Sequence, residues 1–193
     1  MIYGLGTALG WGIADFLAAI VSRRIGAVGA LLLAQFAGLA GLGLVLVFGH
    51  PALHVSAAQL ALLLGNGMIA AIAYIALYKG LELGPIALVS PIVAGYAAFT
   101  ILLAVLFLHE TLGGLVFVGA IVTLGGVMLA STDLRALLTR GGAAVKGSRG
   151  IRFALISMLA FGASTFLISR LARDLGWFLP VTMSRIATTT TLL

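Results

Sequence analysis

Asp15 is an acidic residue deep inside an apolar segment, Ile2–Val21, in which no other side chain is charged. A charge at the centre of a bilayer costs roughly 2.5–3.5 kcal/mol on insertion scales, so an acidic residue at that depth generally has a functional role. In a helix, Thr7 and Trp11 share the face of Asp15, because the three lie at spacings of four. That face suits a cationic or amine-bearing solute that exchanges with a proton. The alternative is a neutral Asp15 that hydrogen-bonds a neighbouring helix.

A second polar feature, Ser90-Pro91, interrupts the apolar segment Pro85–Leu108. Proline lacks a backbone donor and frees a carbonyl one turn earlier. An unsatisfied backbone group in lipid costs several kcal/mol, so such a break must face protein or a wet cavity. Ser90 could hydrogen-bond the freed groups. These residues predict an irregular helix beside a cavity, and the alternative is a packing kink without one. The preceding Gly84-Pro85 predicts where this helix starts, because proline suits a first turn.

Tyrosine and threonine side chains add polar groups to two of the apolar segments. Tyr74 lies in Leu60–Tyr78, while Tyr96 and Thr100 lie about one turn apart in the following segment. Phenol groups in these positions could line a cavity for an amphipathic solute. Tyrosine also anchors helices at the membrane surface, and this is the role expected of Tyr78.

Other chemistries find little support in the residues. The chain has no cysteine, which excludes disulfides, thiolate metal sites and cysteine nucleophiles. His50 and His54 are spaced by four, but no third metal ligand accompanies them. Glu110 beside His109 is better suited to capping a helix than to binding a solute. No GxxxxGK[ST] motif is present, which argues against an ATPase. We therefore expect no catalytic residue, cofactor or metal.

The apolar composition of the chain indicates which kind of secondary structure positions these side chains. The chain is 62% hydrophobic and 8% charged, with a mean hydropathy of +1.25, whereas soluble domains are roughly 45–50% apolar and 25% charged. A soluble core could not hide so much apolar surface, and the short alternating segments of a membrane β-barrel are absent. The net charge of +6 lies at the ends of the apolar segments. Charged residues at these positions set the orientation of membrane helices, and they do not indicate a nucleic-acid partner.

The hydropathy pattern predicts an all-α polytopic membrane protein with about seven spans in the lipid bilayer. Most connections are short, so consecutive helices should be antiparallel neighbours. Two buried amides, Gln35 and Asn66, are expected to hydrogen-bond between helices. The expected spans are Ile2–Val21, Ala27–Phe48, Leu60–Tyr78, Pro85–Leu108, Leu115–Ala130, Phe153–Leu171 and Leu179 to the end.

An internal repeat organises these spans. A shift of 150 residues superimposes Leu9, Gly12, Phe16, Leu17, Arg23 and Gly26 on Leu159, Gly162, Phe166, Leu167, Arg173 and Gly176. Five spans per copy is an odd number, so the copies should be inverted across the bilayer. The predicted units are a five-helix repeat at 1–132, a basic loop at 133–152 and the start of a second repeat at 153–193. The sequence ends inside an apolar segment, which predicts an incomplete second copy that needs further helices or a homodimer.

Several motifs, taken in order, resemble the EamA-like family of the drug/metabolite transporter (DMT) superfamily. They are Trp11-Gly12-Ile13-Ala14-Asp15-Phe16 followed by Arg23, then Tyr78–Gly84, Val89-Ser90-Pro91-Ile92, Leu108-His109-Glu110 and the glycine-rich Gly119–Leu129. The resemblance implies ten helices in two inverted five-helix repeats. It implies carriers of small metabolites, amino acids or drugs, often exporters, that work by alternating access.

The chain departs from the family pattern at two positions. Family members often carry an uncharged polar residue where Asp15 stands and an arginine where Gln35 stands. In the second copy, Arg185 occupies the position that matches Gln35. The distribution of Lys and Arg places the N-terminus outside by the positive-inside rule, whereas the resemblance implies that it lies inside, so the orientation stays open.

The function expected from these observations is a multi-pass permease of a bacterial-type inner membrane. It would move a small-molecule substrate, with energy from an ion gradient or from the solute's own gradient. The expected substrate and ion pathway comprises Asp15, Trp11, Thr7, Ser90, Pro91, Tyr96, Thr100 and Tyr74. Two alternatives are a membrane enzyme acting on lipid-linked substrates and a structural or assembly subunit. The lack of a polar cavity between the first and fourth helices would favour the subunit.

Overall fold

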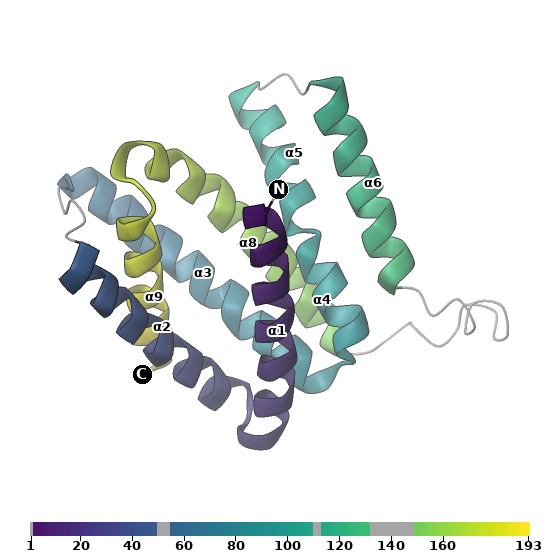
Figure 1. Cartoon of the computed structure of the whole chain (residues 1–193), viewed down its shortest axis with the longest axis horizontal. Helices are drawn as coiled ribbons and strands as arrows, with labels where there is room; N and C mark the ends of the chain where they lie inside the picture. Colours follow the sequence, from purple (N-terminus) through teal and green to yellow (C-terminus); the bar gives the residue numbers. More distant parts are fainter. Residues whose placement is uncertain (1, 50–54, 110–112, 132–148) are drawn as a thin grey trace, which may run out of the picture.

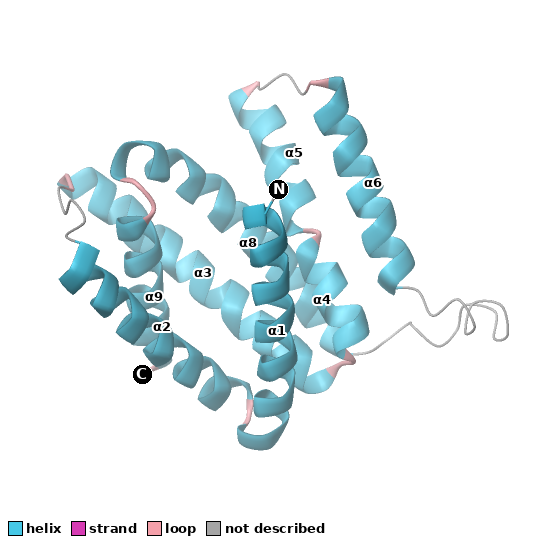
Figure 2. Cartoon of the chain, viewed as in Figure 1, coloured by secondary structure: helices cyan, strands magenta, loops and turns pink. Residues whose placement is uncertain are grey.

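The computed structural model describes residues 2–49, 55–109, 113–131 and 149–193, and every regular element in these ranges is a helix (Figures 1 and 2). The helices are α1 (Ile2–Ile25), α2 (Ala27–Gly49), α3 (Ala57–Leu83), α4 (Ile86–Ala94), α5 (Tyr96–Leu108), α6 (Gly114–Ser131), α8 (Arg149–Leu175) and α9 (Phe178–Leu192).

Five segments of the described chain are long and apolar enough to cross a membrane. They are Gly4–Ile25, Ala27–Gly49, Ala57–Leu83, Ile86–Leu108 and Arg149–Leu175. The remaining two predicted spans coincide with α6 and α9, which are helices of 18 and 15 residues. The structure therefore confirms an all-α polytopic membrane protein.

Local signals in the sequence account for several helix boundaries. Ser56 and Gln59 form a capping box at the start of α3, in which the Gln59 N–H donates to Ser56 Oγ (3.2 Å) and the Ser56 N–H donates to Gln59 Oε1 (2.9 Å). Pro85 precedes the first residue of α4, as predicted. Gly26 and Gly176 have φ values of +81° and +70° and separate α1 from α2 and α8 from α9. Glycine adopts this left-handed backbone conformation without a Cβ penalty.

The irregularity in the fourth span lies later than predicted. Ser90 and Pro91 are both inside α4, and the helix is interrupted at Gly95, between α4 and α5. A Cβ at Gly95 would lie 3.1 Å from Met158 Sδ in α8, so the missing side chain lets α8 pack closely at the break. The position of the kink therefore depends on a neighbouring helix as well as on proline.

Helix α3 lies at the centre of the bundle, where it contacts α1, α2, α4, α8 and α9 (Figure 1). It approaches α8 closely at Gly80 and at its C-cap residue Gly84, which face Gly150. A Cβ at Gly150 would lie 2.6 Å from the Gly84 Cα, which shows that the two backbones are nearly in contact. Small residues permit such approaches between membrane helices.

The core beside this crossing is formed by buried residues of α1, α2, α3, α4 and α8. Tyr78 belongs to it and is 9% exposed, next to Leu77 and Leu81. The expectation that Tyr78 anchors a helix at the membrane surface is therefore wrong. Its position one residue after Leu77 on α3 turns its ring toward the packed helices, where its apolar surface is buried.

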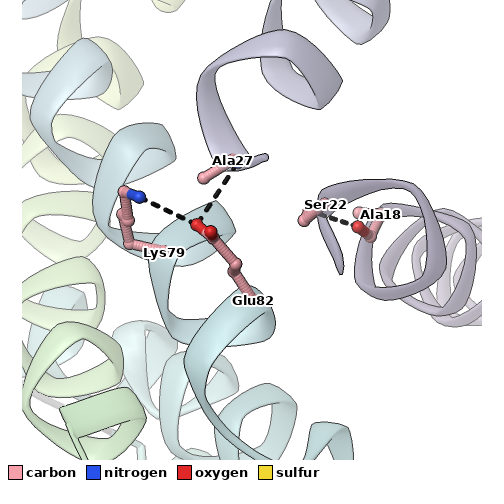
Figure 3. A network of polar contacts seen from close by, with 5 residues as sticks. All are labelled: Ala18, Ser22, Ala27, Lys79 and Glu82. Atoms are coloured by element: carbon pink, nitrogen blue, oxygen red, sulfur yellow. Dashed lines mark hydrogen bonds and ion pairs between the residues drawn. The ribbon is translucent and has the colours of Figure 1, made fainter. Parts of the chain in front are cut away.

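Polar contacts join the α1–α2 turn to the end of α3, and we call this group the turn network. Arg23 donates from Nη2 to the Gly84 carbonyl (2.9 Å) and from Nε to the Leu81 carbonyl (3.3 Å). Glu82 Oε2 accepts from the Ala27 N–H (3.3 Å) and from Lys79 Nζ (2.8 Å), as Figure 3 shows. The first N–H of α2 and the last carbonyls of α3 are thus paired, which satisfies groups that helix ends leave open.

Candidate functional site

A cavity of about 510 Å³ lies among α1, α3, α4, α5, α8 and α9. Its polar and aromatic lining consists of Trp11, Asp15, Tyr74, Ser90, Tyr96, Phe161, Ser164, Thr165, Ser184 and Arg185. The rest of the lining is apolar: Ala70, Leu77, Val93, Ala94, Ala97, Ile168 and Val181. The cavity therefore combines mainly apolar walls with a few polar groups, as small-molecule sites generally do.

Asp15 and Ser90 join α1 to α4 in the cavity wall. Ser90 donates a hydrogen bond of 2.6 Å from Oγ to Asp15 Oδ2. The sequence suggested that this hydroxyl would serve backbone groups freed by Pro91. It donates to the carboxyl group of Asp15 instead. The contact joins two helices, as the packing alternative for Asp15 requires, but it also places the acid at the surface of a cavity.

Aromatic rings form a second part of the wall. Tyr74 of α3 and Phe161 of α8 stack edge to face, with ring centroids 4.9 Å apart. Tyr96 of α5 lies 6.0 Å from the same Phe161 ring. Trp11 adds an indole from α1, one turn before Asp15. Edge-to-face pairs are favourable beyond the area they bury, so contacts through Phe161 hold the rings from α3, α5 and α8 together in the cavity wall.

Arg185 brings a cation to the same cavity from α9. Its Nη1 atom donates to Gln35 Oε1 (2.9 Å) and to the Ala34 carbonyl (3.5 Å), both on α2. A Cβ at Gly38 would lie 2.2 Å from this Nη1 atom. The guanidinium therefore occupies space that exists because residue 38 has no side chain.

The residues predicted to form the pathway divide into two groups. Five line the cavity: Trp11, Asp15, Tyr74, Ser90 and Tyr96. Three do not. Thr7 is exposed two turns before Asp15 on α1, and Pro91 lies within α4 beside Ser90. Thr100 donates to the carbonyls of Tyr96 (3.0 Å) and Gly162 (3.1 Å), so its hydroxyl joins α5 to α8.

The sequence did not single out Arg185, Phe161 or Thr165 as site residues. A signal for them was present in the 150-residue shift, which relates Trp11 to Phe161 and Asp15 to Thr165. All four of these residues line the cavity. The shift also relates Gln35 to Arg185, and these two residues bond each other. Residues that lie 150 positions apart in the chain therefore meet at one site.

The two buried amides hydrogen-bond between helices, as predicted. Gln35 and Asn66 are each 1% exposed. Gln35 accepts from Arg185, and Asn66 Nδ2 lies 3.4 Å from Ser184 Oγ on α9. Their other amide atoms, Gln35 Nε2 and Asn66 Oδ1, have no partner among the described residues. These half-satisfied amides place additional polar atoms next to the α9 residues that line the cavity.

The described chain offers no cluster of three or more His, Cys, Asp or Glu residues that could hold a metal ion. His50, His54 and Glu110, which the sequence had singled out for other roles, lie outside the described residues. His109 is described and ends α5 with a left-handed backbone (φ 51°).

The two ends of the bundle differ in packing. Residues 4–14 of α1 are all exposed, and they span about three turns, so no face of this half is covered by another described helix. At the opposite end of α1, Ala18, Ala19 and Ser22 are buried beside the turn network. The cavity residues Trp11 and Asp15 lie where the uncovered half meets the packed half.

The described helices surround a half-open cavity lined by a few polar groups, an arrangement compatible with a membrane transport protein. The family model that describes the EamA-like transporter family matches residues 1–132. Because this match covers more than half of the chain, the protein belongs to the EamA-like transporter family, which is part of the DMT superfamily. Neither a search of curated proteins nor a search of solved structures found a match.

Proposed function

We propose that this protein carries a small solute through the bilayer by alternating access, with the cavity between α1 and α4 as the binding site. The observation that carries the proposal is the Asp15–Ser90 hydrogen bond in the wall of a cavity among six helices. An acid inside a membrane-spanning helix is expensive to retain unless it has a function. Family membership supports transport of small molecules as the general activity.

The finer parts of the proposal are export, proton coupling and an inner-membrane location. Asp15 is suited to coupling because one carboxyl group can hold either a proton or the cationic group of a solute. Ser90 would stabilise the ionised form when neither is bound, since its hydroxyl already donates to Oδ2. Exchange of a proton for a solute at this carboxyl group would move the two in opposite directions.

Two inverted repeats are part of the same proposal, with units at 1–132 and 153–193 joined by the loop at 133–152. Support comes from Gly26 and Gly176, which lie 150 positions apart and both end helices with positive φ. Gln35 and Arg185 have the same separation and are in contact. Transporters with inverted repeats place their sites at the repeat interface.

Alternating access requires one end of the cavity to close while the other opens. The turn network ties α1 and α2 to the end of α3, and Gly150 brings α8 against the same place. The uncovered half of α1 lies toward the other end. We propose that the structure corresponds to a state closed at the turn network, and that the opposite state requires the network to separate.

The alternatives receive less support. An assembly subunit was expected to lack a polar cavity between the first and fourth spans, and the Asp15–Ser90 pair lies in such a cavity. A lipid-modifying enzyme would need clustered acids, histidines or serines at the membrane surface. The acid that this cavity contains lies midway along α1, ten residues before the helix ends.

The proposed function is tested by a metabolite screen on sealed vesicles that contain the protein. We expect at least one small solute to cross faster than in protein-free vesicles. Ala94→Trp, which fills the cavity, should abolish that flux, whereas Ala40→Trp on the exposed face of α2 should preserve it. Equal flux through the Ala94→Trp variant would mean that solute does not pass through this cavity.

A further inference from the structure

A further cavity, of about 440 Å³, lies between the start of α3 and the end of α8, and we call it the end pocket. Its described lining consists of Leu62 on α3 and of Leu167, Arg170, Leu171, Arg173 and Asp174 on α8. None of these residues lines the cavity that contains Asp15. We propose that the end pocket binds an anionic phospholipid, whose phosphate contacts the two arginines and whose acyl chain lies against the leucines. This inference does not depend on the proposed function.

The charges of the end pocket favour an anion. Arg170 and Arg173 are three residues apart on α8, and helix side chains at that spacing are neighbours, with Cβ atoms about 5–6 Å apart. Asp174 lies one turn after Arg170 but forms no ion pair with it, so the guanidinium of Arg170 is not neutralised. Guanidinium groups bind phosphate oxygens through charge-assisted hydrogen bonds. The two arginines and one acid give the pocket a net charge of +1, which one lipid phosphate would balance.

The leucines of the end pocket favour a ligand with an apolar part. Leu62 is 57% exposed and Leu167 is 37% exposed. Both belong to segments that are long and apolar enough to span a membrane. Leu167 lies about one turn nearer the middle of α8 than Arg170, so the apolar part of the pocket begins beneath the charged part. Apolar surface gains about 25 cal/mol per Å² when it is removed from water. An acyl chain would cover these side chains, whereas a small dissolved anion would leave them exposed.

The position of the end pocket along α8 corresponds to the depth of lipid head groups. Arg173 lies in the last turn of α8, and Trp177, in the turn before α9, is 61% exposed. Tryptophan is enriched at the membrane–water interface, and arginine side chains near helix ends extend to the same interface. The bilayer itself supplies phosphates at this depth, which favours a lipid over a dissolved anion as the occupant.

Trp177 also provides a way to measure binding. The chain contains two tryptophans, so Trp11→Phe leaves Trp177 as the only indole, three residues after Asp174. The full chain with this substitution is reconstituted in phosphatidylcholine vesicles, and lipids brominated near the carboxyl ends of their acyl chains are added as short-range quenchers. We expect brominated phosphatidylglycerol to quench Trp177 at a mole fraction about threefold or more below that of brominated phosphatidylcholine, because basic residues at the membrane surface attract anionic lipids.

Variants in the Trp11→Phe chain assign this preference to the end pocket. Replacing both arginines, by Arg170→Gln and Arg173→Gln, should remove it. Asp174→Asn should increase it, because the net charge of the pocket would rise by one, and this variant provides an independent measurement if the double variant fails to fold. Arg152→Gln is the matched control, since Arg152 is an exposed arginine near the opposite end of α8, and it should leave the preference unchanged.

Glycerol phosphate distinguishes a lipid from a free anion, because it carries the phosphate without an acyl chain. In excess, it should not reduce quenching by brominated phosphatidylglycerol. Three results would overturn the inference: equal quenching by the two brominated lipids, a preference that survives the loss of both arginines, and displacement of the lipid by glycerol phosphate. None of these results would alter the flux measured in the vesicle screen, so the inference and the proposed function can fail separately.

Discussion

The guanidinium of Arg185 donates a hydrogen bond of 2.9 Å from Nη1 to Oε1 of Gln35, a residue 150 positions earlier in the chain. The same separation relates Gly26 to Gly176 at two helix junctions. Two positions related by a two-fold axis can touch only near that axis. Under the repeat proposal, this contact therefore marks the line where the two units meet, and Arg185 supplies a guanidinium to a cavity shared by both.

Gly38→Ala should weaken ligand binding and cost some stability. The added Cβ would lie 2.2 Å from Arg185 Nη1 and would displace the guanidinium. The displaced guanidinium would lose its bond to the buried Gln35, so the unfolding free energy should fall by about 1–3 kcal/mol. We expect affinity for the solute identified in the vesicle screen to fall about tenfold. Gly41→Ala, where a Cβ meets nothing within 4 Å, is the control and should bind normally.

Asp15→Asn should separate solute movement from proton movement. The amide keeps the shape of the side chain but cannot release a proton at neutral pH. We expect solute-driven pH changes in vesicles to disappear in Asp15→Asn and to persist in Asp174→Asn, which changes an exposed acid on α8. Unchanged proton movement in Asp15→Asn would contradict proton coupling at this carboxyl group, while leaving transport itself in place.

Ser90→Ala should destabilise the bundle through Asp15. The hydroxyl donates to Asp15 Oδ2 at 2.6 Å, and a hydrogen bond to a charged group contributes about 1.5–3 kcal/mol. We expect a loss of roughly 1–3 kcal/mol in unfolding free energy, measured by denaturant titration in mixed micelles. In an Asp15→Asn background the loss should shrink. Equal losses in both backgrounds would show that Ser90 acts independently of Asp15.

Hydropathy was sufficient to predict the helices, because bilayer thickness and backbone hydrogen bonding leave few alternatives to apolar helices. The start of α4 could also be predicted, since Gly84-Pro85 acts locally. The break lies at Gly95, four residues after Pro91, where α8 packs close enough that a Cβ would lie 3.1 Å from Met158 Sδ. Proline signals that an irregularity is near, and tertiary packing decides its position.

The site was predictable to the extent that polar residues are rare in apolar segments. Asp15, Ser90 and Tyr96 stand out for that reason, and all three line the cavity. Arg185 lies near Thr188 in a segment of lower hydropathy, where a charged residue is less unusual and is therefore a weaker sign of a site. Its place in the cavity depends on the pairing of α9 with α2, which links residues 150 positions apart. Thr100 was predicted to line the pathway, but its hydroxyl donates to the Gly162 carbonyl of α8 instead.

Glu82→Gln should loosen the closed end of the bundle. Glu82 Oε2 accepts from the Ala27 N–H and from Lys79, and the loss of its charge weakens both contacts. The chain has no native cysteine, so Ser22→Cys, which is buried beside this network, reports opening by its rate of maleimide labelling. Net contributions of 0.5–1.5 kcal/mol per hydrogen bond predict labelling about threefold to tenfold faster.

The control for this measurement is Asp174→Asn, which removes an acid from α8 outside the turn network and should leave the labelling rate unchanged. A rate in the Glu82→Gln variant equal to that of the parent would mean that the network does not hold this end closed. A rate that rises equally in both variants would indicate general destabilisation.

Gly150→Ala should be the most destabilising of these substitutions. The new Cβ would lie 2.6 Å from the Cα and 2.8 Å from the N of Gly84, and neither backbone atom can move without shifting α3. Overpacking of this kind costs about 1–3 kcal/mol, occasionally more. We expect a drop of that size in unfolding free energy, whereas Gly43→Ala, with no atom within 4 Å of its Cβ, should be neutral or slightly stabilising. Equal stability of the two variants would contradict the backbone contact between α3 and α8, and with it the packing that places Phe161 and Thr165 in the cavity.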